Sequence, residues 1–291
     1  MRKDLKMKLR KGSKIMKKNT KYRYPTTKRE TIEGQRHYNI NDGQWKLPSV
    51  TTILDRTQSA EKREGLRKWR EAKGEEEATR IVDTSAARGT AMHKILERYI
   101  IEQGYLDLTD NGLQAHHMAK RVIEQGLCNI PEYYGTECTL YYPGLYAGST
   151  DLVCIHKGEE AIVDFKQTNK PKKREWVGDY FLQLAAYAMA HDYIYKTSIP
   201  KGVIMMCSKD RFYQEFVIHG TEFKKAKHDF LRRVTEYYEI IREPKVDVKE
   251  GDFLEKAEKE KKELAESYKE SVRQTKERKE FYPKAIDGYS E

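Results

Sequence analysis

Two carboxylates and one lysine are the residues of this chain whose types and spacing point most directly to chemistry. Asp164 and Lys166 are two residues apart in an apolar run rich in β-branched residues, so a strand would place both side chains on one face. Asp151 belongs to the preceding apolar run, and the Lys157-Gly158-Glu159-Glu160 segment between the runs predicts a hairpin turn. The sequence therefore predicts that two carboxylates and an ammonium group meet at one end of a hairpin.

Such a set of side chains could bind a hard divalent cation and cleave phosphate esters. Mg²⁺ prefers oxygen ligands, and two converging carboxylates form the minimum anionic site for it. A bound metal polarises a phosphoryl oxygen and lowers the pKa of bound water. Lys166 could hold or deprotonate that water and offset charge on the phosphate. The alternative is a surface ion pair on a hairpin, because the D-x-K pattern also occurs by chance.

Further polar residues recur at spacings that could extend this site. Gln183 and Tyr187 are four residues apart in a predicted helix, which places them on one face. His93 lies near the start of another predicted helix, and Glu137 lies in a strand-like run. Each has an ordinary alternative: a half-exposed helix face for Gln183 and Tyr187, a core or surface histidine for His93, and a solvent-facing carboxylate for Glu137.

Taken together, the motifs resemble those of the RecB-type branch of the PD-(D/E)xK nucleases. In chain order they are G-x-x-x-H ending at His93, Glu137, G-x-x-D ending at Asp151, D-x-K at Asp164–Lys166 and Q-x-x-x-Y at Gln183–Tyr187. Their order and separations match that branch, over roughly residues 35 to 220. The resemblance implies an α/β restriction-endonuclease-like core, with a mixed central sheet flanked by helices and an N-terminal helical portion.

The resemblance also implies a role for each motif residue. The expected metal ligands are His93, Asp151, Asp164 and the backbone carbonyl of Phe165. The residues expected around the chemistry are Asp151, Asp164, Lys166 as the catalytic lysine, Gln183 and Tyr187 as orienting groups, and Glu137 as a support for a second metal.

The activity implied by the resemblance is a Mg²⁺- or Mn²⁺-dependent exodeoxyribonuclease that acts on free ends of single-stranded DNA, in DNA repair or replication. Two alternatives stay open: a DNA-end-binding protein with an inactive nuclease core, and a double-strand exonuclease that serves recombination. DNA is the expected partner, and replication or recombination proteins are further candidates. The polarity of digestion, the product length and the oligomeric state are not indicated.

Composition argues against several other classes of protein. No run approaches the ~18 apolar residues of a membrane helix, and no apolar segment follows the basic start as in a secretory signal. Four cysteines without C-x-x-C spacing predict reduced thiols and no iron–sulfur cluster. No P-loop motif is present, so no nucleotide cofactor is expected. The cytoplasm is the expected compartment, of the host if the chain is phage-encoded, with the mitochondrial matrix as the runner-up.

Positive charge is concentrated near the N-terminus. The formal net charge is +10, and residues 1–30 carry thirteen Lys or Arg against Asp4 and Glu30. Such a segment favours polyanions. We therefore predict a flexible basic arm over residues 1–34, a nuclease domain over 35–245, and a charged helical or disordered tail over 246–291.

The pattern of apolar residues predicts the elements that must position the site. Helices are expected over residues 50–56, 61–72, 76–103 (with a potential break at Gly89), 111–126, 174–195 and 221–242. Strands are expected over 134–142, 145–155, 160–166, 201–207 and 212–218, after a hairpin that turns at Asn41-Asp42-Gly43. Six tyrosines around the proposed site could stack unpaired bases, with strand propensity as the alternative: Tyr133, Tyr134, Tyr141, Tyr142, Tyr146 and Tyr180.

Overall fold

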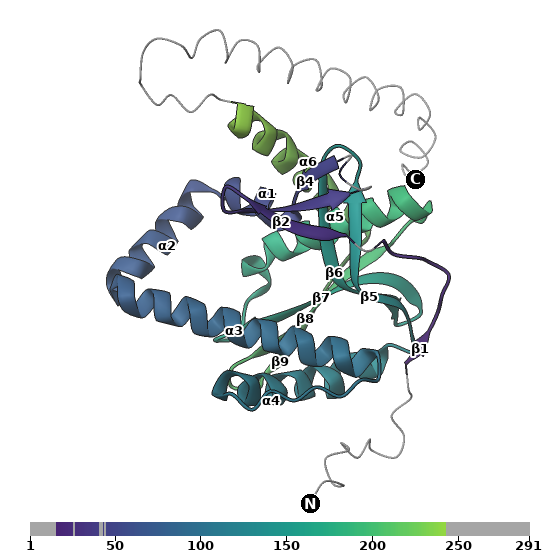
Figure 1. Cartoon of the computed structure of the whole chain (residues 1–291), viewed down its shortest axis with the longest axis horizontal. Helices are drawn as coiled ribbons and strands as arrows, with labels where there is room; N and C mark the ends of the chain where they lie inside the picture. The colour runs from purple at the N-terminus through teal and green to yellow at the C-terminus, as the bar shows by residue number, and fades with distance from the viewer. Residues whose placement is uncertain (1–15, 26, 41–42, 44, 243–291) are drawn as a thin grey trace, which may run out of the picture. The chain divides into compact units, whose positions relative to one another are not determined.

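The computed structural model describes residues 16–25, 27–40, 43 and 45–242 of the chain (Figure 1). Contacts between Cα atoms divide the chain into two units, Met1–Val234 and Thr235–Glu291. Apart from the end of helix α6, the residues discussed below lie in the first unit. The first fifteen residues of the predicted basic arm, the Asn41-Asp42 turn and the predicted tail over 246–291 lie outside the described residues.

A six-stranded mixed sheet contains the strands that were predicted to carry the site. Its strand order is β1-β5-β6-β7-β8-β9. The bounds are β1 Lys17–Lys18, β5 Glu132–Tyr142, β6 Tyr146–His156, β7 Glu159–Thr168, β8 Lys201–Ser208 and β9 Tyr213–His219. Strands β5, β6 and β7 are antiparallel neighbours, whereas β8 runs parallel to β7. A parallel pair needs a crossover connection, which helix α5 (Gly178–Tyr195) supplies.

A second, antiparallel sheet precedes the helices of the first unit. It consists of β2 (Lys28–Ile32), β3 (Gln35–Ile40) and β4 (Trp45–Pro48). The remaining helices are α1 Val50–Arg56, α2 Ala60–Lys73, α3 Glu75–Ile100, α4 Asp110–Gln125 and α6 Gly220–Arg242, with short 3₁₀ helices η1 Leu127–Asn129 and η2 Arg174–Trp176. This arrangement confirms the predicted α/β class with a mixed central sheet and helices before it.

Helices cover the central sheet on both sides, and strand alternation decides which side chains reach each side. α3 and α4 pack together against one face, as Figure 1 shows, and α5 packs against β5 and β8. Val163 and Phe165 belong to the apolar cluster formed with α3 and α4. Because side chains alternate along a strand, Asp164 and Lys166 point to the α5 side, where they contact Gln183.

The structure differs from the sequence-based expectations in three local respects. Residues 16–34 of the predicted flexible arm contribute β1 and β2, so pairing with other strands orders this part. α3 continues through Gly89 without a break. A Cβ at Gly89 would lie 3.3 Å from Gln167 Cγ, so the glycine allows close packing against β7. The predicted helix over 174–195 begins as η2, and α5 starts only at Gly178. Among the described residues no helix is both long and apolar enough to cross a membrane.

Candidate active site

The hairpin of β6 and β7 brings Asp151 and Asp164 to the point where the two strands separate. Backbone pairing runs from His156 opposite Glu159 up to Leu152 opposite Val163, so each aspartate is the next residue of its strand. Asp151 Oδ2 accepts a hydrogen bond from the backbone N–H of Phe165 at 2.5 Å. The Asp151 side chain thus accepts the backbone N–H of Phe165, which lies beyond the last backbone pair of β6 and β7. Both carboxylates are buried, with 8% of Asp151 and 2% of Asp164 exposed.

Lys166 is held beside Asp164 by a short chain of polar contacts from α5. The Lys166 ammonium forms an ion pair with Asp164 Oδ2 and donates to Gln183 Oε1 at 3.2 Å. Gln183 Nε2 donates to Asp164 Oδ1 and to Tyr187 Oη, each at 3.1 Å. One amide therefore orients the acid and the lysine together, and Tyr187 orients the amide. The ring of Tyr180 lies 5.0 Å from Lys166 Nζ.

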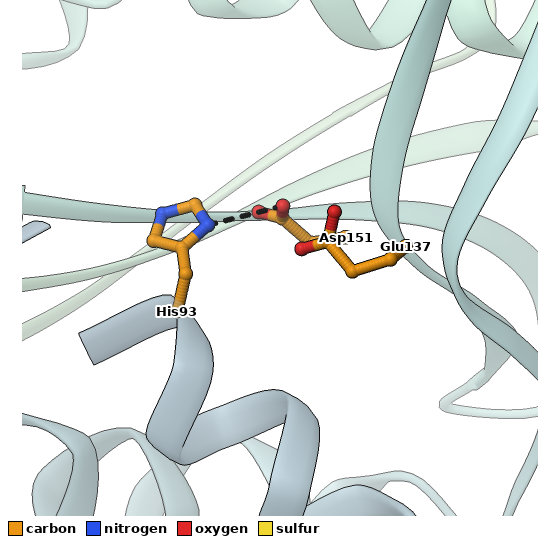
Figure 2. A group of neighbouring side chains, drawn as sticks. All are labelled: His93, Glu137 and Asp151. Atoms are coloured by element: carbon orange, nitrogen blue, oxygen red, sulfur yellow. Dashed lines mark hydrogen bonds and ion pairs between the residues drawn. The ribbon is translucent and has the colours of Figure 1, made fainter. Parts of the chain in front are cut away.

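His93 and Glu137 approach Asp151 from two other elements (Figure 2). His93, on α3, lies with Nδ1 3.1 Å from Asp151 Oδ1. Glu137 comes from β5, and one ligand atom from each of the three residues lies within 4.8 Å of the other two. Figure 2 shows the imidazole and both carboxylates converging on a common space. An imidazole and two carboxylates at this separation form a donor set suited to a divalent cation.

The backbone at Glu137 is unusual for a residue with a side chain. Its φ is +48°, in the left-handed region that costs energy for residues other than glycine. Thr136 pairs with Leu152 and Cys138 with Thr150, so Glu137 stands opposite Asp151 across β5 and β6. Two like charges directly opposite each other destabilise a sheet. A cation bound between them would offset that repulsion.

Burial and mutual charge shift the pKa values of the buried site residues. Burial lowers the pKa of His93, but the Asp151 carboxylate outweighs burial and raises this pKa to about 9. Burial raises the pKa of Asp164 to about 6, against the opposing effect of Lys166. Burial would lower the pKa of Lys166, yet Asp164 and Asp151 raise it overall. The ammonium of Lys166 therefore stays protonated at neutral pH.

At Glu137 and Asp151 the charges of neighbouring groups act in opposite directions. Desolvation by the surrounding protein raises the pKa of Glu137, and the charge of Asp151 adds to this. Burial would also raise the pKa of Asp151, but His93 and Lys166 lower it overall. Asp151 is therefore the carboxylate of the site that keeps its negative charge most readily.

His93, Glu137 and Asp151 fit a divalent cation by the chemistry of their donors, one imidazole and two carboxylates. Asp164 Oδ2 is buried and forms an ion pair with the Lys166 ammonium. Asp164 lies outside the group formed by His93, Glu137 and Asp151. Phe165 is tied to the site through its backbone N–H, and the role of its carbonyl stays a prediction.

The structure thus brings the predicted residues into one neighbourhood, joined by direct contacts. Asp151 contacts His93 and Phe165, and Asp164 contacts Lys166 and Gln183. Glu137 differs from the expectation in one respect. It joins the same cluster as His93 and Asp151, where the sequence had suggested a support for a separate, second metal. The role of each residue stays a prediction.

A buried arginine next to this site was not recognised from the sequence. Arg88, on α3, is 2% exposed and has no carboxylate partner among the described residues. Its guanidinium donates to Gln167 Oε1 at 2.9 Å and to Gln114 Oε1 at 3.0 Å, and also to Asn169 Oδ1. It therefore joins α3, α4 and the residues that follow Lys166. Its position just before the Gly89 motif was the signal available.

Three of the six tyrosines considered for base stacking are part of the core. Tyr133, Tyr134 and Tyr146 are buried, with 5%, 6% and 0% exposed. Tyr146 Oη donates to the carbonyl of Ala186 on α5, which fixes it inside the protein. These three rings therefore pack the sheet, and the stacking interpretation is wrong for them.

Comparison with known proteins finds distant relatives along part of the chain, and no protein-family model matches it. Mitochondrial genome maintenance exonuclease 1 of Mus musculus is 28% identical over 172 residues, which are 56% of this chain and 50% of that protein. The Xenopus tropicalis protein of the same name is 24% identical over 208 residues, 63% of this chain and 59% of that one. The human protein is 27% identical over 172 residues. The chain spans about half the length of these relatives.

The comparison with solved structures finds two exonucleases by name, each at low structural similarity. A putative exonuclease from Eubacterium rectale has a TM-score of 0.39 and 16% identity, covering 59% of this chain and 78% of that one. An alkaline exonuclease from Laribacter hongkongensis has a TM-score of 0.25 and 13% identity, covering 53% and 82%. The sequence comparison establishes distant homology to mitochondrial genome maintenance exonuclease 1, which confirms the resemblance found from the motifs.

Proposed function

We propose, from this distant homology and from the geometry of the site, that the chain is a divalent-metal-dependent DNA exonuclease. It hydrolyses phosphodiester bonds from the free ends of single-stranded DNA. The observation that carries the proposal is the buried convergence of Asp151, Asp164 and Lys166 where β6 and β7 separate. A solvated surface ion pair, the alternative weighed from the sequence, would be exposed, whereas both acids are buried.

The proposed metal ligands are Asp151, Asp164 and His93, with the Phe165 carbonyl, and Glu137 lies within reach of the same ion. When bound, Mg²⁺ or Mn²⁺ supplies polarisation of a phosphoryl oxygen and a lowered pKa of water. The donor set is of hard oxygen atoms and one imidazole, which suits either ion.

The protein's own groups supply orientation and charge. Lys166 stays protonated beside two acids, so its ammonium can stabilise the negative charge that develops on the phosphate. Gln183 holds Lys166 and Asp164 at fixed positions, and Tyr187 holds Gln183. Burial of the acids strengthens each electrostatic interaction relative to water. Placing these groups before the substrate arrives lowers the cost of reaching the transition state.

End-labelled single-stranded DNA with and without metal tests the proposal. Asp164→Ala and Lys166→Ala should each reduce the rate by about 10²–10⁴-fold, which is the usual effect of removing such a group. Lys120→Ala, which removes an exposed lysine from α4, is the matched control and should leave the rate unchanged. Full activity of either site variant would refute the assignment of these residues. A wild type that binds ends without releasing nucleotides would favour the inactive end-binding alternative.

The form of the substrate separates the finer parts of the proposal. A linear single strand should be degraded, whereas a covalently closed single-stranded circle should survive. Cleavage of the circle would contradict dependence on ends. Equal rates on blunt duplex and single strand would contradict the strand preference and favour the double-strand recombination alternative.

A further inference from the structure

Two exposed aromatic rings flank a basic loop directly after the strand that carries Lys166. Trp176 and Phe212 are 59% and 54% exposed, the highest values for aromatic side chains in the described part of the chain. Trp176 ends η2, in the loop between β7 and α5, and Phe212 lies in the turn between β8 and β9. Large exposed rings lose burial energy unless a partner covers them. We therefore expect a binding partner to cover both rings.

Positive charge surrounds these rings. We call the loop 169–176 together with the turn 209–212 the rim. Arg174 of the rim forms an ion pair with Glu222. No ion pair within the described residues engages the other basic side chains of the rim, Lys170, Lys172, Lys173, Lys209 and Arg211. The acids of the rim are Glu175 and Asp210 only. Lys173 Nζ lies 5.6 Å from the centre of the Trp176 ring. A ring with a free face and a cation beside it can stack a base and neutralise its phosphate.

Each of the two segments of the rim is fixed to the sheet. The Lys209 N–H donates to the Thr168 carbonyl at 2.9 Å, which joins the turn to the end of β7. Gln214 of β9 exchanges two hydrogen bonds of 2.8 Å with the backbone of Lys172. A surface held in place before binding loses little conformational freedom when a ligand arrives.

The rim is continuous with the candidate active site. Tyr180, whose ring lies beside Lys166, is four residues after Trp176, and its N–H donates to the Val177 carbonyl. Lys170 is four residues after Lys166 and two residues beyond the end of β7 at Thr168. A strand with its scissile phosphate at Lys166 would therefore run onto the rim within a few nucleotides.

We propose that the rim binds the single-stranded DNA that extends from the active site, with a base stacked on Trp176 and phosphates at Lys173 and its neighbours. This inference rests on the proposed function, because it supplies the strand to the same site. Stacking requires an unpaired base with a free π face but reads no base identity. The rim therefore selects single strands over duplex and tolerates any sequence. Phe212 offers a second ring for the same strand.

Binding in the presence of a chelator tests the rim without cleavage. The probe is fluorescent oligothymidylate about 20 nucleotides long, which exceeds the footprint of ~4–16 nucleotides of small single-strand-binding folds. Trp176→Ala should raise the Kd about 5- to 100-fold, the usual loss for one stacked base. Trp176→Tyr, which keeps a ring, should recover most of the affinity. Tyr105→Ala removes an exposed ring outside the rim and should bind within about twofold of the wild type.

An abasic strand of the same length separates stacking from charge. Wild type and Trp176→Ala should bind it equally, because no base is present to stack. Lys173→Gln should reduce the salt dependence of binding, by about the release of one counterion. The inference is overturned if Trp176→Ala binds oligothymidylate as tightly as Tyr105→Ala does, which would assign the rim to another partner. The inference is also overturned if Trp176→Ala binds the abasic strand more weakly than the wild type does.

The cleavage assay keeps this inference distinct from the proposed function. If the wild type cleaves DNA with metal but Trp176→Ala binds oligothymidylate as tightly as the wild type, only the inference about the rim is refuted. Wild type that shows the Trp176 effect but never releases nucleotides refutes the nuclease proposal and leaves the rim as a single-strand-binding surface.

Discussion

Replacing Gly148 by alanine should disturb catalysis through Tyr187. Gly148 is the glycine of the G-x-x-D motif and lies on β6. A Cβ added there would lie 2.6 Å from Tyr187 Cε1 and 3.1 Å from Tyr187 Oη. Carbon atoms in contact prefer about 3.5–4.0 Å. Tyr187 is only 3% exposed on α5, so the ring cannot turn away without shifting its neighbours.

The expected loss of stability and of rate follows from the contacts of Tyr187. Overpacking of a core costs about 1–3 kcal/mol of folding free energy. Tyr187 Oη accepts from Gln183, which in turn binds Asp164 and Lys166. A displacement of about 1 Å at a reacting group can cost about 10²-fold in rate. We therefore expect Gly148→Ala to lose about 1–3 kcal/mol of stability and about 10²-fold in kcat, more than its stability loss explains.

Urea unfolding and single-turnover cleavage measure the two effects side by side. Gly202→Ala is the matched control, because its Cβ would lie 2.8 Å from Leu184 Cβ on the same helix. Leu184 contacts neither Lys166 nor Asp164 through a hydrogen bond, so this variant should be destabilised while its kcat stays within a few-fold of the wild type. Equal losses of kcat in the two variants would refute the view that Tyr187 positions the lysine.

The remaining predictions concern the metal and the fold. His93 retains its proton below a pKa of about 9, and a metal ion must displace that proton to bind. The affinity for Mn²⁺, measured by calorimetry, should therefore rise about tenfold per pH unit between pH 6 and 9. A flat profile would exclude His93 as a ligand. Because Asp164 has a pKa of about 6, a second proton should compete below that pH and steepen the dependence. Glu137→Gln should weaken Mn²⁺ binding measurably if Glu137 is a ligand of the ion. An unchanged Mn²⁺ titration would show that Glu137 is an ordinary strand carboxylate. Arg88→Met should cost about 1–3 kcal/mol in urea unfolding, since it removes the donor to the amide oxygens of Gln167, Gln114 and Asn169. A neutral result would contradict that network.

The part of the site that follows strand and helix periodicity was predictable from the sequence. Alternation placed Asp164 and Lys166 on one face, and the Lys157-Gly158 turn paired β6 with β7, where both residues have positive φ. A spacing of four put Gln183 and Tyr187 in contact on α5. These are local rules of backbone geometry, so they hold whatever the surrounding fold does.

The part that depends on long-range packing was not predictable. The motifs placed Glu137 at the site, but its left-handed backbone and its grouping with His93 are signalled by no neighbouring residue. Arg88 has its amide partners on α4, on β7 and just after β7, some 26 to 81 residues away in sequence. Residues 16–34 looked flexible by charge, yet β1 pairs with β5, more than a hundred residues later. Partners at such separations are set by the tertiary fold and leave no periodic pattern in the sequence.

A crystal of the protein soaked in Mn²⁺ tests the central claim most directly, because anomalous scattering locates the ion independently of any assay. The account predicts one strong peak bonded to Asp151 and to further members of the set His93, Glu137 and Asp164. Peaks confined to other surfaces, with Asp151 still bonded only to His93 and Phe165, would contradict it.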